Sequence, residues 1–100
     1  MPYDIHLDND SAEVHLHGEF TFAQHRKFRH VVSKLRDHAP GQVVVNLSKV
    51  EYIDAAGLGL LLVARDAVSG TGGRATLKGA SGQVGRMLAV ARFDALFQAA

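Results

Sequence analysis

A run of ten residues without a charged or polar side chain, Ala55–Ala64, constrains the fold of this chain more than any other stretch. It directly follows Asp54, and aspartate is a favoured N-cap because its carboxylate accepts hydrogen bonds from the free amides of a helix's first turn. The run therefore predicts a helix that is almost wholly apolar in its first turns. Because ten residues are too few to cross a bilayer, this helix is either buried in a core or presents an apolar side to a partner.

The composition is that of an ordinary globular protein, and we expect residues 1–100 to form one domain. Hydrophobic residues make up 47% and charged residues 21% of the chain, which argues against a disordered protein. The net charge of +1 gives no general attraction to nucleic acid or to a membrane. The absence of cysteine excludes disulfides and thiol chemistry. The N-terminus lacks the basic and apolar pattern of a secretory signal, so we expect a cytoplasmic protein without direct membrane insertion.

Hydrophobic periodicity in the first half of the chain predicts a hairpin, a helix and a strand. Apolar residues alternate with polar ones over residues 4–17, which indicates two half-buried strands. Thr21 and Gln24 fit a capping box, which opens a helix of about residues 22–38. The β-branched run of residues 42–47 does not alternate and is typical of a strand covered on both faces.

Two further helices and one strand are predicted in the second half of the chain. The helices span about residues 55–69 and 81–92, and the strand between them covers residues 74–78. The order of elements predicts an α/β domain with a mixed sheet of four to five strands, an N-terminal hairpin and parallel later strands. Apolar residues at 93–97 predict a C-terminal segment that packs on this domain.

Charged residues set the expected orientation of the central helix. If Arg65 and Asp66 face solvent, the 3.6-residue period places Ala55, Leu58 and Leu62 on the same side. The opposite, core-facing side then consists of Ala56, Leu60, Val63, Ala64, Ala67 and Val68. Exposed leucines beside a helix start form a candidate docking patch. The alternative is that a loop or the C-terminal segment covers them.

Two glycines lie near the start of this helix, Gly57 and Gly59. Each costs about 1 kcal/mol of helix propensity relative to alanine. Their presence therefore indicates that another group approaches the helix backbone closely. That group is either a binding partner or the strand beneath the helix, and the sequence leaves both explanations open.

The segment around this helix start resembles the signature of STAS domains, and more narrowly that of bacterial anti-sigma-factor antagonists. Residues 46–48 (N-L-S) and 54–59 (D-A-A-G-L-G) are similar to the D-L-S…(I/M)-D-S-S-G-L-G pattern of that family. The resemblance extends over almost the whole chain, including Gly18-Glu19 after the second predicted strand. It implies a single STAS domain over residues 1–100 that acts as a binding module and not as an enzyme.

The resemblance also implies a phosphorylation switch. In that family the dephosphorylated form binds a GHKL-type serine kinase that doubles as an anti-sigma factor, and this binding frees a sigma factor. Phosphorylation of the serine after the signature aspartate ends the binding, and a PPM-type phosphatase restores it. This chain departs from the pattern at that position, since Ala55 cannot accept phosphate. A second departure is Thr21-Phe22, where many relatives have an acidic residue.

Three explanations of Ala55 are open. Alanine has been introduced in place of serine, the natural protein is a permanently binding antagonist, or the chain belongs to a STAS branch that does not use phosphorylation. The third explanation gives an alternative function, the STAS regulatory subunit of a membrane transporter ATPase or another phosphorylation-independent signalling module. The residues expected to bind the partner are Asp54, Ala55, Ala56, Gly57, Leu58, Gly59, Leu62, Thr21, Phe22 and Ser48.

Other residue patterns indicate no cofactor and no catalysis. His6, His15 and His17 share one face of the predicted hairpin, but no carboxylate or thiol completes a metal-ligand spacing. Basic side chains on the helix of residues 22–38 indicate a solvated face or an acidic protein partner, because aromatic residues for base stacking are missing there. No nucleophile has a base at a recognisable spacing. A nucleotide-binding STAS domain would need a pocket beside Asp54.

Overall fold

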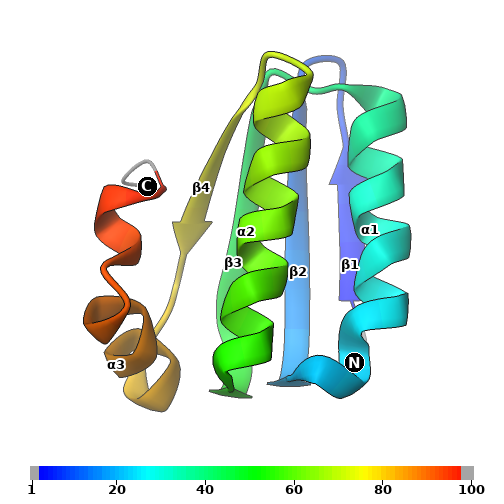
Figure 1. Cartoon of the computed structure of the whole chain (residues 1–100). Helices are drawn as coiled ribbons and strands as arrows, with labels where there is room; N and C mark the ends of the chain where they lie inside the picture. The colour runs from blue at the N-terminus through cyan, green and yellow to red at the C-terminus, as the bar shows by residue number, and fades with distance from the viewer. Residues whose placement is uncertain (1–2, 98–100) are drawn as a thin grey trace.

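Four strands form one mixed sheet, with the N-terminal hairpin at one edge (Figure 1). The structure is a computed structural model and describes residues 3–97, apart from the side chain of Asp94. In sheet order the strands are β1 (Tyr3–Leu7), β2 (Ser11–Phe20), β3 (Gln42–Ile53) and β4 (Arg74–Lys78). β1 is antiparallel to β2, whereas β2, β3 and β4 run parallel. The predicted α/β fold is confirmed, although the domain predicted over residues 1–100 reaches beyond the described residues at both ends.

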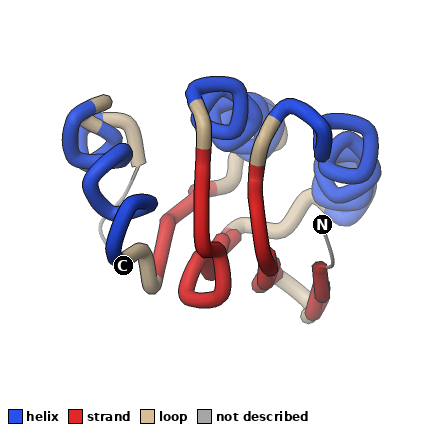
Figure 2. The backbone as a smooth tube through the Cα atoms, turned by 90° about the horizontal axis from the view of Figure 1, so that it is seen from below, coloured by secondary structure: helices blue, strands red, loops and turns tan. Residues whose placement is uncertain are grey.

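The three predicted helices are present, and α1 and α2 lie side by side on one face of the sheet (Figures 1 and 2). They are α1 (His25–His38), α2 (Ala55–Gly70) and α3 (Gly82–Val90), with short 3-10 turns η1 (Phe22–Gln24) and η2 (Phe93–Ala95). α3 lies beyond β4 in Figure 1 and contacts β3. Among the described residues, none of these helices is long and apolar enough to cross a membrane.

The predicted capping box before α1 does not form. The Thr21 side chain makes no cap hydrogen bond, and the Gln24 amide instead donates to the Thr21 carbonyl over 2.9 Å. This backbone bond closes a 3-10 turn, so the α-helix begins only at His25. The apolar stripe of α1 is nevertheless as predicted, because Phe28 and its neighbours along that stripe are buried against the sheet.

Within residues 3–97 only one face of the sheet is covered by helices, and the prediction that β3 is covered on both faces is wrong. Val43 and Val45 are buried under the helices, whereas Val44 and Asn46 on the other face are only half-buried. The reason lies in the order of the strands. Both crossovers, β2–α1–β3 and β3–α2–β4, step in the same direction across the sheet. Because such crossovers are right-handed, both place their helix on the same side.

The start of α2 is packed tightly against the end of β2. A Cβ added at Gly57 would collide with the carbonyl oxygen of Phe20 and would lie 2.7 Å from Cγ1 of Ile53. A Cβ added at Gly59 would meet no atom within 4 Å. The sequence left open whether a partner or the sheet approaches these glycines. For Gly57 it is the sheet, so the fold requires this glycine, whereas the fold does not require Gly59.

Replacement of these two glycines by alanine has opposite expected effects on the free energy of unfolding. Gly57→Ala lowers it by at least about 2 kcal/mol, because the backbone of Phe20 must move away from the new methyl group. Gly59→Ala raises it by about 0.5–1 kcal/mol through helix propensity alone. Urea denaturation of the two variants and the unmodified chain measures both values. Equal stabilities of the two variants would contradict this account of the junction.

Candidate partner-binding surface

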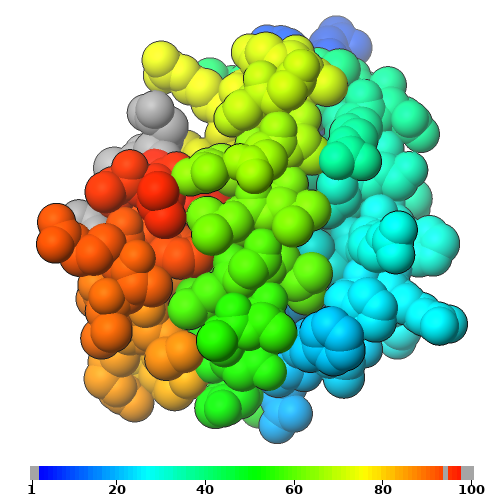
Figure 3. Space-filling view, viewed as in Figure 1, coloured from blue at the N-terminus to red at the C-terminus, as the bar shows by residue number. Residues whose placement is uncertain are grey.

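The segments that lead out of β2 and β3 meet at one end of the sheet. Phe20 and Ile53, the last residues of these parallel strands, are paired in register. Thr21-Phe22 and Asp54-Ala55 therefore leave the sheet next to each other, and Figure 3 shows the first turns of α2 (green) beside the segment before α1 (blue). Open α/β sheets bind their ligands outside the carboxyl ends of the strands, which is where these residues lie.

Asp54 caps α2, as the sequence predicted. Its Oδ1 accepts a hydrogen bond of 2.7 Å from the amide of Gly57, and its carbonyl accepts one of 3.0 Å from the amide of Leu58. The carboxylate is half-buried and is directed at the helix start, where the macrodipole favours a negative charge. Asp54 therefore orients α2, and its carboxylate is engaged within the fold.

A second side chain holds the end of β3, and sequence reasoning missed it. The side-chain amide of Gln83 in α3 donates to the carbonyl of Ile53 over 2.8 Å and accepts from its amide over 3.0 Å. Gln83 thus pairs with β3 as a further strand would. No local signal in the sequence identifies this contact, because it joins residues 30 positions apart. Together with the Asp54 cap, it fixes the position from which α2 begins.

The outward side of α2 is only partly the predicted one: Ala55 and Asp66 are exposed as predicted, but the leucines are not. Ala55, Gly59 and Val63 form the exposed line, and the Val63 side chain is 45% exposed although it was predicted to face the core. Leu58 and Leu62, predicted to face outward, are half-buried and packed against the core. The exposed line is rotated by about 70° from the predicted one, judged from the 3.6-residue period. Ala64, Ala67 and Val68 are buried as predicted, Ala56 and Leu60 are half-buried, and Leu61, which was not assigned, is fully buried.

The side chain of Arg65 explains the error in orientation. Arg65 is half-buried, and its Nη1 lies 3.5 Å from the carbonyl of Leu96, while its Nη2 pairs with the Asp66 carboxylate over 2.9 Å. Its charged end thus reaches polar groups to either side while the side chain stays half-buried, as long cationic side chains often do. The direction of Arg65 therefore does not mark the solvent side of the helix.

Phe22 joins this surface and Ser48 does not. Phe22 is 64% exposed, and its ring stacks on that of His25 with centroids 4.6 Å apart, beside the half-buried Thr21. Ser48 lies within β3 next to Gly79, six positions before Asp54 in the sequence. At about 3.3 Å per strand residue, this places it roughly 15–20 Å from the start of α2. Of Thr21, Phe22 and Ser48, all predicted to lie beside the start of α2, only Thr21 and Phe22 do so.

The uncovered face of the sheet carries the histidines of the hairpin. His15 contacts Glu13, His17 lies 3.4 Å from the Asp4 carboxylate, and the rings of His6 and His15 meet edge-on. Within residues 3–97 no group of three or more such side chains is arranged to hold a metal ion. His17 and Asp4 are thus partners across β1 and β2, whereas His15 and Glu13 are neighbours on the same strand, β2.

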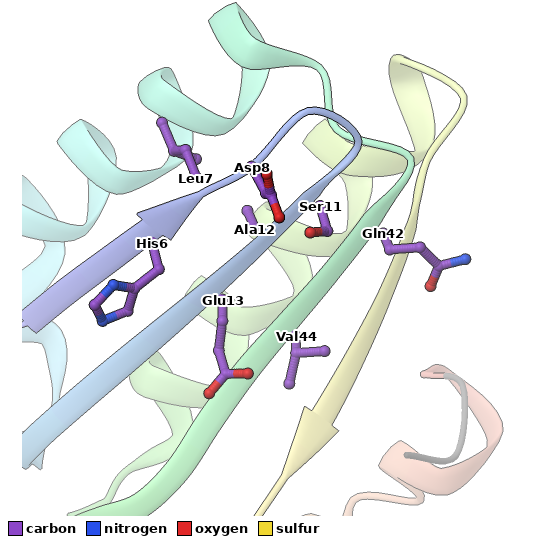
Figure 4. A pocket seen from close by; sticks show the side chains of 8 residues that line it. All are labelled: His6, Leu7, Asp8, Ser11, Ala12, Glu13, Gln42 and Val44. Atoms are coloured by element: carbon purple, nitrogen blue, oxygen red, sulfur yellow. The ribbon is translucent and has the colours of Figure 1, made fainter.

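A hollow of about 320 Å³ lies on the same face, at the amino ends of β2 and β3 (Figure 4). It is lined by His6, Leu7, Asp8, Ser11, Ala12, Glu13, Gln42 and Val44. None of these eight residues belongs to the predicted partner-binding set. The hollow lies at the opposite end of the strands from Asp54, so it is not the pocket that a nucleotide-binding site beside Asp54 would need.

Comparison with known proteins identifies the family. The family model described as "Mlab, STAS domain" matches residues 4–98, and the chain therefore belongs to the STAS domain family. A STAS-domain containing protein of Pseudomonas aeruginosa (strain UCBPP-PA14) is 31% identical over 91 residues, which cover 91% of this chain and 89% of that protein.

Two solved structures show the same fold at low sequence identity. An anti-sigma factor antagonist from Mycobacterium paratuberculosis has a TM-score of 0.85 at 16% identity. The alignment covers 98% of this chain and 83% of that protein. A sulfate transporter family protein from Wolinella succinogenes has a TM-score of 0.75 at 19% identity, over 90% of this chain and 73% of its own. The fold is thus shared by a protein named as an anti-sigma factor antagonist and by a protein of the sulfate transporter family.

Removal of the Asp54 cap is expected to weaken the fold without abolishing it. Asp54→Ala loses the bond to the Gly57 amide and lowers the free energy of unfolding by about 1 kcal/mol, within the usual range for an N-cap. Asp54→Asn serves as the control, because its side-chain carbonyl can accept the same bond. Thermal and urea denaturation measure both variants, and an Asp54→Ala protein as stable as the original would exclude the capping role.

Proposed function

We propose that this STAS domain is an anti-sigma-factor antagonist that binds a GHKL-type serine kinase/anti-sigma factor and so frees a sigma factor. The observation that carries the proposal is the exposed line of Ala55, Gly59 and Val63 at the carboxyl end of the sheet. Small and apolar residues on a rigid helix start allow a partner backbone to approach closely. Exposed Phe22 supplies an aromatic contact at the edge of this surface.

The leucines of the signature support this surface from beneath. Leu58 and Leu62 are half-buried and pack on the core, so their exposed edges add apolar area next to Gly59. Ala56 and Gly57 contribute through the backbone of the same turns, and Asp54 holds that backbone in place. The partner therefore contacts mainly the outward line of α2 and Phe22.

Position 55 determines whether binding can be switched off. Ala55 is exposed in the first turn of α2, where the helix dipole tolerates an anion. A phosphoryl group there brings about −1.5 to −2 charges into a close apolar contact and opposes binding. With alanine at this position, we propose that the chain stays in its binding-competent form. A PPM-type phosphatase would then have no substrate at this site.

Two matched glycine substitutions in α2 test the binding surface. Gly59→Gln places a side chain on the exposed line and is expected to weaken binding to the purified anti-sigma factor at least about tenfold, by keeping the partner off the helix. Gly70→Gln is the control, because Gly70 is also exposed in α2 and its added Cβ also meets no atom within 4 Å. Isothermal titration calorimetry measures both dissociation constants. Equal binding by both variants would refute the surface assignment.

Restoring a hydroxyl group at position 55 tests the switch. Ala55→Ser is expected to take up one phosphate from the kinase and ATP, and the phosphorylated protein then loses its affinity for the kinase. Ala56→Ser is the control, since residue 56 is half-buried whereas residue 55 is exposed. Intact-protein mass spectrometry detects the phosphate. Failure of Ala55→Ser to be phosphorylated by a kinase that binds it would count against the switch.

The second candidate is a STAS regulatory subunit of a membrane transporter ATPase. It is supported by the fold that this chain shares with a sulfate transporter family protein. In this case the same surface of α2 binds the ATPase, and no phosphorylation is needed at residue 55. Genes for a sigma factor and its kinase beside the gene of this protein support the first function. Genes for a permease and an ATPase support the second.

A further inference from the structure

The exposed face of α1 carries five of the eleven lysine and arginine side chains of the chain. The helix holds five cations, Arg26, Lys27, Arg29, Lys34 and Arg36, and one carboxylate, Asp37. Its formal charge is therefore +4, while that of the whole chain is +1, so the rest of the chain carries −3. All five cations are exposed, and none lies within 4 Å of a carboxylate in the part of the chain that the structure describes.

The positions of these cations are unfavourable for the helix itself. Arg26 and Lys27 occupy the first turn of α1, which contains no acidic residue, and cations at a helix N-terminus oppose the macrodipole. Arg26 and Arg29 stand three residues apart, at a spacing where like charges repel. Local conflicts of this kind, without compensation inside the fold, are expected at functional sites. An external group of negative charge would relieve both.

The basic face continues into the binding surface proposed on α2. Lys34 lines a hollow with Leu7 of the edge strand β1, so the flank of α1 that carries Lys34 faces away from α2. The 3.6-residue period places His25 and Arg29 on the opposite flank, toward α2. Phe22, stacked on His25, lies at the junction of the two helices. Figure 3 shows α1 (cyan) and α2 (green) exposed side by side on one face of the molecule.

We propose that the partner of this surface is an acidic protein, whose carboxylates lie opposite Arg26, Arg29 and neighbouring cations of α1 while its apolar residues contact α2. This inference rests on the proposed function and specifies the chemistry of its partner. Charge complementarity next to an apolar contact is how protein partners are steered and oriented. Arg26, Arg29 and His30 line a shallow hollow on this face, which can accept acidic side chains.

Membranes and nucleic acids fit this face less well. The apolar residues of α1, Phe28, Val31, Val32 and Leu35, are all buried against the sheet, so the helix has no apolar side to insert among lipids. Across its 14 described residues, the exposed positions hold no Phe, Tyr or Trp side chain on which a base could stack. The exposed Phe22 lies outside the helix and adjoins α2.

A charge-reversal pair with a matched control tests the inference. Arg26→Glu/Arg29→Glu reverses two charges on α1, and Arg74→Glu/Lys78→Glu reverses two exposed charges on β4, at the far edge of the sheet. Calorimetry with the purified anti-sigma factor, or with the transporter ATPase if that is the partner, is done at about 50 and about 400 mM NaCl, between which the Debye length falls roughly threefold.

At low salt the α1 double variant is expected to bind at least about tenfold more weakly than the unmodified chain, while the β4 double variant changes less than about twofold. The unmodified chain should lose affinity as salt rises, and the α1 variant should not. If the unmodified chain binds and the α1 variant binds equally well, this inference fails and the proposed function stands. If the unmodified chain binds neither partner, the proposed function fails and the inference fails with it.

Two further probes address the other classes of partner. Vesicles of phosphatidylserine and phosphatidylcholine and a short duplex DNA are titrated with the same variants. Binding of either probe that the α1 double variant loses and the β4 double variant keeps would overturn the inference in favour of a lipid or nucleic-acid surface. No binding of either probe, together with salt-sensitive binding of the protein partner, supports it.

Discussion

The junction between β3 and α2 is the constraint on which the surface of this STAS domain depends. The helix begins so close to the end of β2 that Gly57 has no room for a Cβ beside the carbonyl of Phe20. Two sets of hydrogen bonds keep the helix start in this position. The Asp54 carboxylate accepts a hydrogen bond from the Gly57 amide, and the Gln83 side chain bonds both the amide and the carbonyl of Ile53. A helix start held from both sides presents its outward residues in one fixed position, as a protein-binding surface requires.

The direction of the two crossovers decides which helix surfaces lie on the same face of the sheet. Since β2, β3 and β4 follow one another across the sheet, α1 and α2 lie on the same face. The apolar surface of α2 and the basic face of α1 are therefore neighbours and can contact one partner at the same time. In the described part of the chain, the other face of the sheet has no helix and carries histidines paired with carboxylates, among them His17 with Asp4. The two faces thus differ in chemistry as a consequence of topology.

Residue types and spacing predicted the parts of the site that depend on local geometry. An aspartate before an apolar run is a cap because the amides it bonds lie within the next turn, and the bond from Gly57 to Asp54 confirms this. The orientation of the helix was predicted less well. The charge of Arg65 predicts a solvent-facing side chain, but its contact with the Leu96 carbonyl draws it toward the C-terminal segment. Val63 is consequently exposed where a buried residue was expected.

The sequence by itself determined the α/β class, the order of strands and helices, the cap at Asp54 and the resemblance to STAS domains, because these depend on periodicity and on residues close together in the chain. Only the tertiary structure decided which glycine is indispensable, which side of α2 faces outward and that the sheet is covered on one face. Each of these depends on contacts between distant segments, such as Phe20 with Gly57 or Arg65 with Leu96. Such contacts leave no periodic trace in the sequence, because they form only when separate elements are packed together.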